Sequence, residues 1–148
     1  MILRRAAPVI PLLALLGACH GGHGSDVPGD SSDHAPFHGI AVEETVRFTG
    51  TEPFWGGEVG AGRMLYTTPD NPAGYTVAVT RFAGRGGLSF SGMLDGREMV
   101  LAITPGSCSD GMSDRSYPFV VTLQLEDELR QGCGWTARQP RKGGEQAP

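Results

Sequence analysis

Short runs of alternating apolar and polar residues, interrupted by Gly, Pro and Asp, occupy the chain from about residue 45 to residue 133. A period of two places successive side chains on opposite faces of a strand, so each run predicts a β-strand with one buried face. No stretch in this region has a helical period of useful length. Eight strands are predicted, over Thr45–Gly50, Trp55–Val59, Arg63–Thr67, Tyr75–Phe82, Leu88–Leu94, Glu98–Thr104, Phe119–Leu125 and Leu129–Cys133.

The connections between these runs indicate how the strands pair. Asp95-Gly96 stands between two runs and suits a two-residue type I′ turn, which requires positive φ angles. A second hairpin is predicted across Glu126–Glu128. Strands spaced by roughly 8 to 12 residues with short connections are typical of barrels and sandwiches. We therefore expect an all-β fold, a small antiparallel meander barrel, with a small β-sandwich as the alternative.

Composition divides the chain into segments. About 100 residues, 39–136, are rich enough in apolar side chains to form one domain. Residues 19–38 are dominated by Gly, Ser, Asp, Pro and His, and residues 137–148 are equally poor in apolar side chains. Such segments bury too little apolar surface to offset the entropy of ordering. We expect a flexible tether over 19–38 and a disordered tail over 137–148.

The N-terminus has the pattern of an export signal. Met1–Arg5 carries two positive charges, and Ala6–Leu16 is a run of eleven apolar residues. About 20 residues are needed to cross a membrane as a helix, so this run is too short to be a membrane anchor. Residues 1–18 are predicted to be a signal peptide.

The end of this signal resembles the lipobox of bacterial lipoproteins. Leu16-Gly17-Ala18 precedes Cys19, and the resemblance implies cleavage before Cys19 and a diacylglycerol on its sulfur. Several acyl chains together anchor a protein stably in a membrane. His20 in the following position is compatible with sorting to the outer membrane, on its periplasmic side. The alternative is an ordinary signal peptide that leaves Cys19 free.

The two remaining cysteines, Cys108 and Cys133, form an even pair. In an oxidising compartment such a pair is expected to form a disulfide, here closing a loop of about 26 residues and contributing roughly 3.5 kcal/mol on the chain-entropy estimate. A metal site or a catalytic thiol is the alternative. Two cysteines without a nearby His are a poor ligand set for zinc, which disfavours the metal site.

The charge of the chain excludes one class of partner. Removal of the signal changes the formal charge from −4 to −6, because Arg4 and Arg5 leave with it. No basic cluster occurs between Gly39 and Trp135. Binding to nucleic acid needs such a cluster, so no nucleic-acid partner is expected.

Three sequence blocks resemble a family of uncharacterised bacterial envelope lipoproteins. They are a G-T-E-P-F-W block ending at Trp55, a C-x-D-G-M-S-D-x-x-Y-P block from Cys108 to Pro118, and a late G-C at Gly132-Cys133. The similarity covers about residues 46–135. Members of the family occur beside domains like the META lipoproteins and the inhibitors of C-type lysozyme, which implies a role in the envelope but no reaction.

Two of these blocks supply a candidate binding surface. The loop predicted over Pro105–Pro118 is fourteen residues long, and ordered loops of this length are often functional. We predict that it lies beside the aromatic block at one end of the barrel, with a surface made of Glu52, Trp55, Asp110, Asp114, Arg115 and Tyr117. Two structural alternatives remain open. Phe54 and Trp55 would plug the core, and the loop would be held by an Asp that caps backbone N–H groups and by an Arg115–carboxylate pair.

The sequence offers little for catalysis. All four histidines lie in the tether, as His20, His23, His34 and His38, where they are interpreted as solvated spacer residues or, alternatively, as ligands of a transition metal. The predicted domain therefore lacks a His to activate a nucleophile. Two Asp in one loop are too few for calcium. We expect no catalytic residues, no cofactor and no metal in the domain.

Together these features predict a non-enzymatic, lipid-anchored envelope protein with a β-barrel binding or structural module. Its partners would be the membrane, through the lipid, and an envelope protein or cell-wall component. One alternative is an inhibitor of a cell-wall hydrolase such as lysozyme, because acidic charge suits a basic target. Another is a hydrolase of envelope glycans that uses two carboxylates across a cleft.

Overall fold

The computed structural model describes residues 35–144, and the predicted signal and most of the tether lie outside the described residues. All helices and strands found within residues 35–144 belong to one kind, the β-strand, so the all-β prediction is confirmed. No helix there has the length and apolar character needed to cross a membrane. The strands are β1 (Val46–Thr51), β2 (Phe54–Gly60), β3 (Arg63–Thr68), β4 (Asn71–Ala83), β5 (Leu88–Leu94), β6 (Arg97–Ser109), β7 (Ser116–Leu125) and β8 (Glu128–Trp135).

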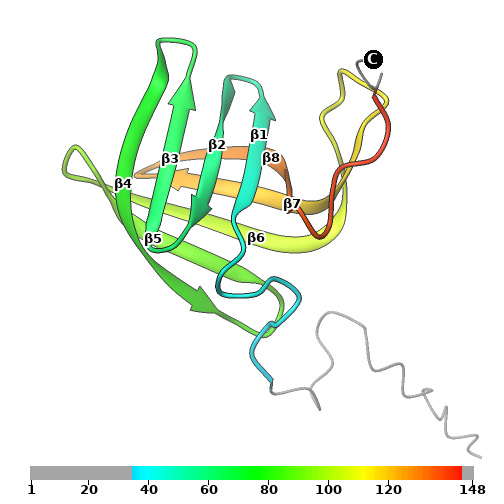
Figure 1. Cartoon of the computed structure of the whole chain (residues 1–148). Coiled ribbons are helices and arrows are strands. Elements are labelled where there is room, and N and C mark those ends of the chain that lie inside the picture. Colours follow the sequence, from blue (N-terminus) through cyan, green and yellow to red (C-terminus); the bar gives the residue numbers. More distant parts are fainter. Residues whose placement is uncertain (1–34, 145–148) are drawn as a thin grey trace, which may run out of the picture.

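Each strand pairs antiparallel with the next, and β1 pairs with β8 to close a barrel. The closing ladder is short, running from Arg47↔Trp135 to Thr49↔Cys133. Figure 1 shows β1–β4 running across the direction of β6–β8, so the barrel is flattened with its two halves crossed. The predicted meander barrel is confirmed. The sandwich alternative fails because the β1–β8 ladder joins the edges that a sandwich would leave open.

The hairpin predicted at Asp95-Gly96 is confirmed. Asp95 and Gly96 have φ angles of 50° and 79°, and Leu94 pairs with Arg97 across them. The β2–β3 turn has the same kind of conformation, with positive φ angles at Ala61 and Gly62. Such turns match the right-handed twist of the strands they join, so a connection of two residues is enough.

The alternating residues point into the barrel and fill it. The side chains that face inward are almost completely buried, and the largest of them include Phe48, Phe119, Met64, Met99, Leu101 and Leu123. Burying a side chain of this size contributes about 1.5–3 kcal/mol. The core extends to Ile40, which precedes β1 and is 1% exposed. The interior is therefore a packed core.

Contacts with the barrel begin before the expected boundary at Gly39. The Phe37 N–H donates to the Gly84 carbonyl at 2.7 Å, and Phe37 packs against the core. The Arg81 guanidinium donates to the Ile40 carbonyl at 3.0 Å. The segment leading into β1 therefore covers the end of the barrel at the β4–β5 turn.

The fourteen-residue loop predicted over Pro105–Pro118 is wrong in extent. β6 continues to Ser109 and β7 begins at Ser116, so only residues 110–115 connect them. Pro105 and Gly106 look like strand terminators because Pro donates no hydrogen bond. The structure accommodates them with a register shift between Pro105 and Cys108, and the ladder resumes at Cys108↔Tyr117.

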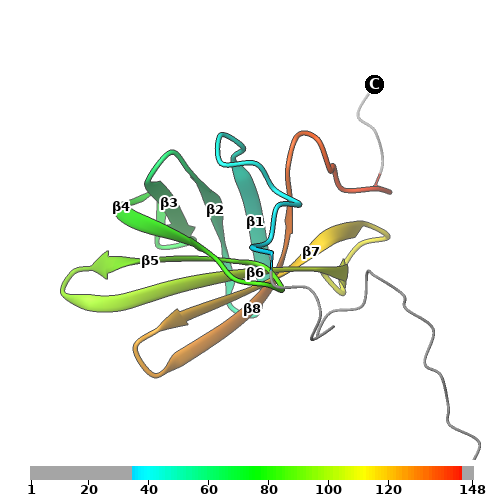
Figure 2. The ribbon, with the colours of Figure 1, turned by 90° about the horizontal axis from the view of Figure 1, so that it is seen from below.

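The segment after β8 also differs from the predicted disordered tail. Residues 136–144, which we call the strap, run back along the β6–β7 connection, and Lys142 pairs with Ser116. Figures 1 and 2 both show the strap (red) on the same side of the barrel as that connection (yellow). The strap is held by backbone hydrogen bonds rather than apolar burial, so an argument from apolar content does not detect it. Residues 145–148 lie outside the described residues.

Candidate functional site

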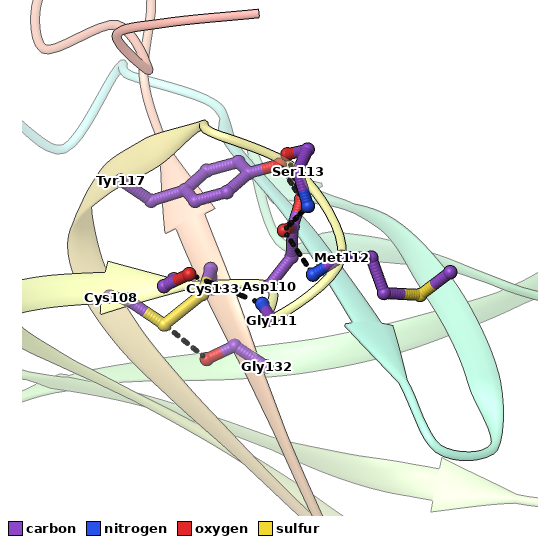
Figure 3. Close-up of a disulfide and its surroundings, with 9 residues drawn as sticks. Cys108, Asp110, Gly111, Met112, Ser113, Tyr117, Gly132 and Cys133 are labelled. Atoms are coloured by element: carbon purple, nitrogen blue, oxygen red, sulfur yellow. Dashed lines mark hydrogen bonds between the residues drawn. A yellow bond between two sulfur atoms is a disulfide. The ribbon is translucent and has the colours of Figure 1, made fainter.

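The β6–β7 hairpin beyond Pro105, which we call the disulfide hairpin (residues 105–118), is tied to the barrel by a disulfide. Cys108 and Cys133 are bonded with their Cα atoms 5.6 Å apart, which confirms the predicted pairing. The Cys108 sulfur also lies 3.3 Å from the carbonyl oxygen of Gly132. Figure 3 shows the bond at the base of the connection between β6 and β7. The disulfide thus fixes the hairpin to β8.

Asp110 organises the tip of this hairpin. One carboxylate oxygen accepts hydrogen bonds from the backbone N–H groups of Met112 and Ser113, at 3.1 and 2.9 Å. The other accepts from the Ser113 hydroxyl at 2.8 Å and the Tyr117 hydroxyl at 3.0 Å. These four bonds, visible in Figure 3, join both sides of the connection.

The same bonds set the acidity of the groups involved. The Ser113 hydroxyl, followed by the N–H groups of Ser113 and Met112, lowers the pKa of Asp110 from 3.8 to about 2. Burial raises the pKa of Tyr117, and the hydrogen bond to Asp110 and its negative charge act in the same direction. Asp110 is therefore ionised and fully engaged with its own loop at neutral pH.

The contacts of Asp110 and Tyr117 are those that the structural alternative predicts. Asp110 caps backbone N–H groups of its own loop, as that alternative expected, and Tyr117 is only 3% exposed. The expected pairing of Arg115 with a carboxylate is wrong, since none of the ion pairs within residues 35–144 includes Arg115. Arg115 instead partly offsets the rise in the Tyr117 pKa.

Trp55 is buried, whereas the predicted binding surface requires it to be exposed. It is 4% exposed, and its indole packs inside the barrel against Phe48, with ring centroids 5.6 Å apart. A Cβ on Gly50 would lie 1.9 Å from the indole nitrogen, and one on Gly132 would lie 3.0 Å from Cζ2. The ring thus spans β1 and β8 next to their closing ladder, and Phe54, at 55% exposure, does not join it in the core.

The structure nevertheless brings the aromatic block and the hairpin together. Thr49, Gly50 and Thr51 of β1 line one groove with Cys108 and Asp110, with a volume of about 230 Å³. Small side chains and backbone form this contact, while the Trp55 ring lies on the inner side of β1. Glu52 is exposed in the β1–β2 turn. A period-two pattern does not say which aromatic residue next to a turn points inward. The sequence therefore did not reveal that the Trp55 side chain is buried.

Some side chains of the hairpin tip are free to meet a partner. Met112 is 68% exposed, and Figure 3 shows its side chain pointing away from the Asp110 cluster. Asp114 is exposed and Arg115 half-buried. A rigid scaffold that presents such a tip is a common arrangement for recognition.

Sequence reasoning missed one part of the site, on the flank of the hairpin. Trp135 packs against Tyr117 with ring centroids 5.6 Å apart, and Arg141 of the strap lies over the Trp135 ring. The strap and the hairpin also line a groove of about 400 Å³. The available signal was an Arg-Lys pair after Pro140 in a segment otherwise interpreted as disordered.

The fold and the site define a class of protein: a closed eight-stranded meander β-barrel with a filled interior and a disulfide-tied hairpin at one end. Comparison of the chain with models of known families, with curated proteins and with solved structures finds no match. Within residues 35–144, no three His, Cys, Asp or Glu side chains are grouped closely enough to hold a metal ion.

Proposed function

We propose that this chain is a lipid-anchored protein of the bacterial envelope, that its barrel is a non-enzymatic binding module, and that it belongs to the lipoprotein family whose blocks it resembles. The observation that carries the binding role is a hairpin tip held rigid from within while its outer side chains remain exposed. The support for anchoring is the sequence around Cys19, which lies outside the described residues.

Rigidity at the tip favours binding. The disulfide fixes the base of the hairpin, and Asp110 fixes its connection through four hydrogen bonds. A loop ordered in advance does not lose this entropy when a partner binds. Exposed Met112 offers a flexible, polarizable contact that adapts to apolar surfaces.

The environment of the candidate acids supports a non-enzymatic role. A general acid works best with a pKa near the working pH, and the pKa of Asp110 is held at about 2. Its oxygens are already occupied by loop donors. A glycan hydrolase would need two carboxyl groups facing each other across a cleft, one of them able to donate a proton, and Asp110 does not offer this.

Site-specific photocrosslinking in cells tests the binding role. The full chain carries a photoreactive amino acid in place of Met112, or in place of Asp95 in the exposed β5–β6 turn as the matched control. We expect a discrete crosslinked adduct from position 112 that is absent from position 95. Equal labelling at both positions, or none at position 112 in folded and disulfide-bonded protein, would refute a recognition role for the tip.

Inhibition of a cell-wall hydrolase is a second candidate, favoured by the formal charge of −6 that the chain would have after removal of residues 1–18. An acidic protein associates readily with a basic enzyme such as lysozyme. An inhibitor would protect peptidoglycan when present in amounts equal to lysozyme. An enzyme acting on envelope glycans would instead release product when present in trace amounts.

A further inference from the structure

The strap is held against the hairpin mainly through its backbone. The Lys142 N–H donates to the Ser116 carbonyl and the Ser116 N–H donates to the Lys142 carbonyl, each at 2.8 Å. The Gly144 N–H donates to the Asp114 carboxylate at 3.0 Å. The strap therefore adds a short antiparallel bridge to the free side of β7, as a bound peptide does when it extends a sheet.

An aromatic contact holds the Arg141 side chain of the strap. The Arg141 guanidinium carbon lies 5.0 Å from the centroid of the Trp135 ring. Trp135 is itself fixed by Tyr117 on β7. We call Asp114, Ser116, Tyr117 and Trp135 together the seat. The face of the Trp135 ring binds a cation, and the N–H and carbonyl groups of Ser116 bind an extended backbone.

The fit of the strap also restricts which residues follow the cation. A Cβ on Gly143 would lie 2.4 Å from the Asp114 carbonyl oxygen, and one on Gly144 would lie 2.5 Å from the Arg115 side chain. Both glycines also have positive φ angles, at 75° and 82°. The seat thus accepts an extended segment with a basic residue followed closely by Gly.

The first part of the strap is firmly held, since Thr136 is 1% exposed and the Gln139 side chain donates to the Gly39 carbonyl at 2.7 Å, but the part after Gln139 is loosely held. Pro140, Arg141, Lys142 and Gly143 are all exposed. Segments with few buried apolar contacts open at a much lower free energy than a packed core. The 400 Å³ groove lined by Tyr117, Pro118, Pro140 and Lys142 lies along the same boundary.

We infer that the seat is a peptide-docking site that takes an extended Arg- and Gly-containing segment of a protein partner, and that the strap occupies it as a built-in competitor. The strap shows which residues the seat binds, since Arg141 lies over Trp135 and the Lys142 backbone is bonded to Ser116. This inference names a partner chemistry for the disulfide hairpin and therefore rests on the proposed function. An intramolecular competitor weakens every external ligand until it is displaced.

The probe is a synthetic peptide, QPRKGG, with the sequence of residues 139–144. Its binding is followed by shifts of the Ser116 amide and the Trp135 indole N–H in nuclear magnetic resonance spectra. One protein variant ends at Gln139, which keeps the turn closed by the Gln139–Thr136 bonds. A matched control ends at Gly144. A second variant, Gly143→Val, displaces the strap without shortening the chain.

We expect the variant ending at Gln139 and the Gly143→Val variant to bind the peptide at least about tenfold more tightly than the control ending at Gly144. The peptide with Ala in place of Arg should bind about two- to fivefold more weakly, because the contact with Trp135 is lost. Methylation of the backbone nitrogen of the peptide Lys should also weaken binding, because it removes the N–H that donates to the Ser116 carbonyl. Changes made on the peptide leave the fold of the protein untouched.

Absence of binding by folded, strap-displaced protein would overturn the inference, as would equal affinity of the Arg and Ala peptides. Strap-mediated dimers in the control would overturn it too, since the occupant would then be a second copy. Hydrogen exchange at Lys142 as slow as in the core would show that the seat does not open. Crosslinking from position 112 with no peptide binding at the seat would leave the proposed function standing and reject this inference alone.

Discussion

At the scale of single residues, Asp110 shows how one carboxylate can determine a loop conformation. Its two oxygens take donors from Met112, Ser113 and Tyr117, so the D-G-M-S-D sequence closes on itself. These bonds are stronger to the ionised carboxylate than to the neutral acid, so they lower the pKa of Asp110 from 3.8 to about 2. The stability of the hairpin should therefore depend on pH.

The expected pH dependence follows from the direction of this pKa change. A carboxyl whose pKa is lower in the folded protein than its usual 3.8 stabilises the fold fully above that value and loses this contribution as pH falls towards about 2. Asp110→Asn removes the titrating group. Urea unfolding at pH 5, 3 and 2 should show a smaller loss of stability in Asp110→Asn than in the unmodified protein. Asp95→Asn in an exposed turn is the control, and identical pH profiles for the unmodified protein and Asp110→Asn would contradict the assignment.

A second prediction concerns the glycine under Trp55. Gly50→Ala places a methyl group 1.9 Å from the indole nitrogen, so the ring or the strand must move. Overpacking of this kind costs about 1–3 kcal/mol. Gly86→Ala is the matched control, because a Cβ there meets nothing within 4 Å. Urea denaturation of both variants measures the difference, and equal stabilities would show that Trp55 is not wedged against β1.

At the scale of elements, the disulfide hairpin has two parts. Strands β6 and β7 continue through Pro105 and Pro118, and the connection between them is closed by hydrogen bonds among its own residues. The bulge between Pro105 and Cys108 lets β6 follow β7 beyond the barrel wall. Without the disulfide, this extension would be joined to β8 only through β7 and the strap. The bond between Cys108 and Cys133 therefore matters most for the part of the chain that carries the exposed tip.

Replacing both cysteines tests this role. The Cys108→Ser, Cys133→Ser double variant should lose roughly 3.5 kcal/mol of unfolding free energy, the chain-entropy estimate for a loop of this length. The barrel should still form, because its interior is filled by a cluster of apolar side chains that includes neither cysteine, although Cys133 is itself only 2% exposed. Circular dichroism checks the fold, and chemical denaturation measures the loss. A loss below about 1 kcal/mol would mean that the hairpin holds its place by packing alone.

At the scale of the whole molecule, the barrel presents its two ends differently. One end is covered by the segment leading into β1, where Ile40 and Phe37 pack on the core. The strap meets this segment, since the Gln139 side-chain amide donates to the Gly39 carbonyl at 2.7 Å and Arg138 lies 3.8 Å from the Glu44 carboxylate, whereas the β5–β6 and β7–β8 turns lie at the opposite end.

The anchoring proposal predicts a specific loss of lipid. Cys19→Ala removes the only proposed acceptor, so cells should no longer incorporate labelled palmitate into the protein, and cleavage by the lipoprotein signal peptidase should stop. Cys108→Ser is the control and should keep the label. Palmitate in the Cys19→Ala protein would sink the proposal.

The sequence by itself determined the class of fold. Strict alternation in β1, β5 and β7 marks residues that need a dry face, and Asp95-Gly96 marks a turn whose φ angles few other pairs adopt. These are local properties of the chain, set by sterics and by the period of the strand. The pairing of the cysteines could also be predicted, since the expected export would make a disulfide their default state.

Only the tertiary structure decided what the candidate site contains. Trp55 is buried because Gly50 and Gly132, far apart in sequence, leave room for its ring where β1 meets β8. The strap is ordered because Ser116 offers it a free strand edge and Trp135 a ring face. Neither partner can be identified from the local sequence of the segment concerned. A residue's exposure depends on what other strands bring to it, and that is fixed only when the barrel closes.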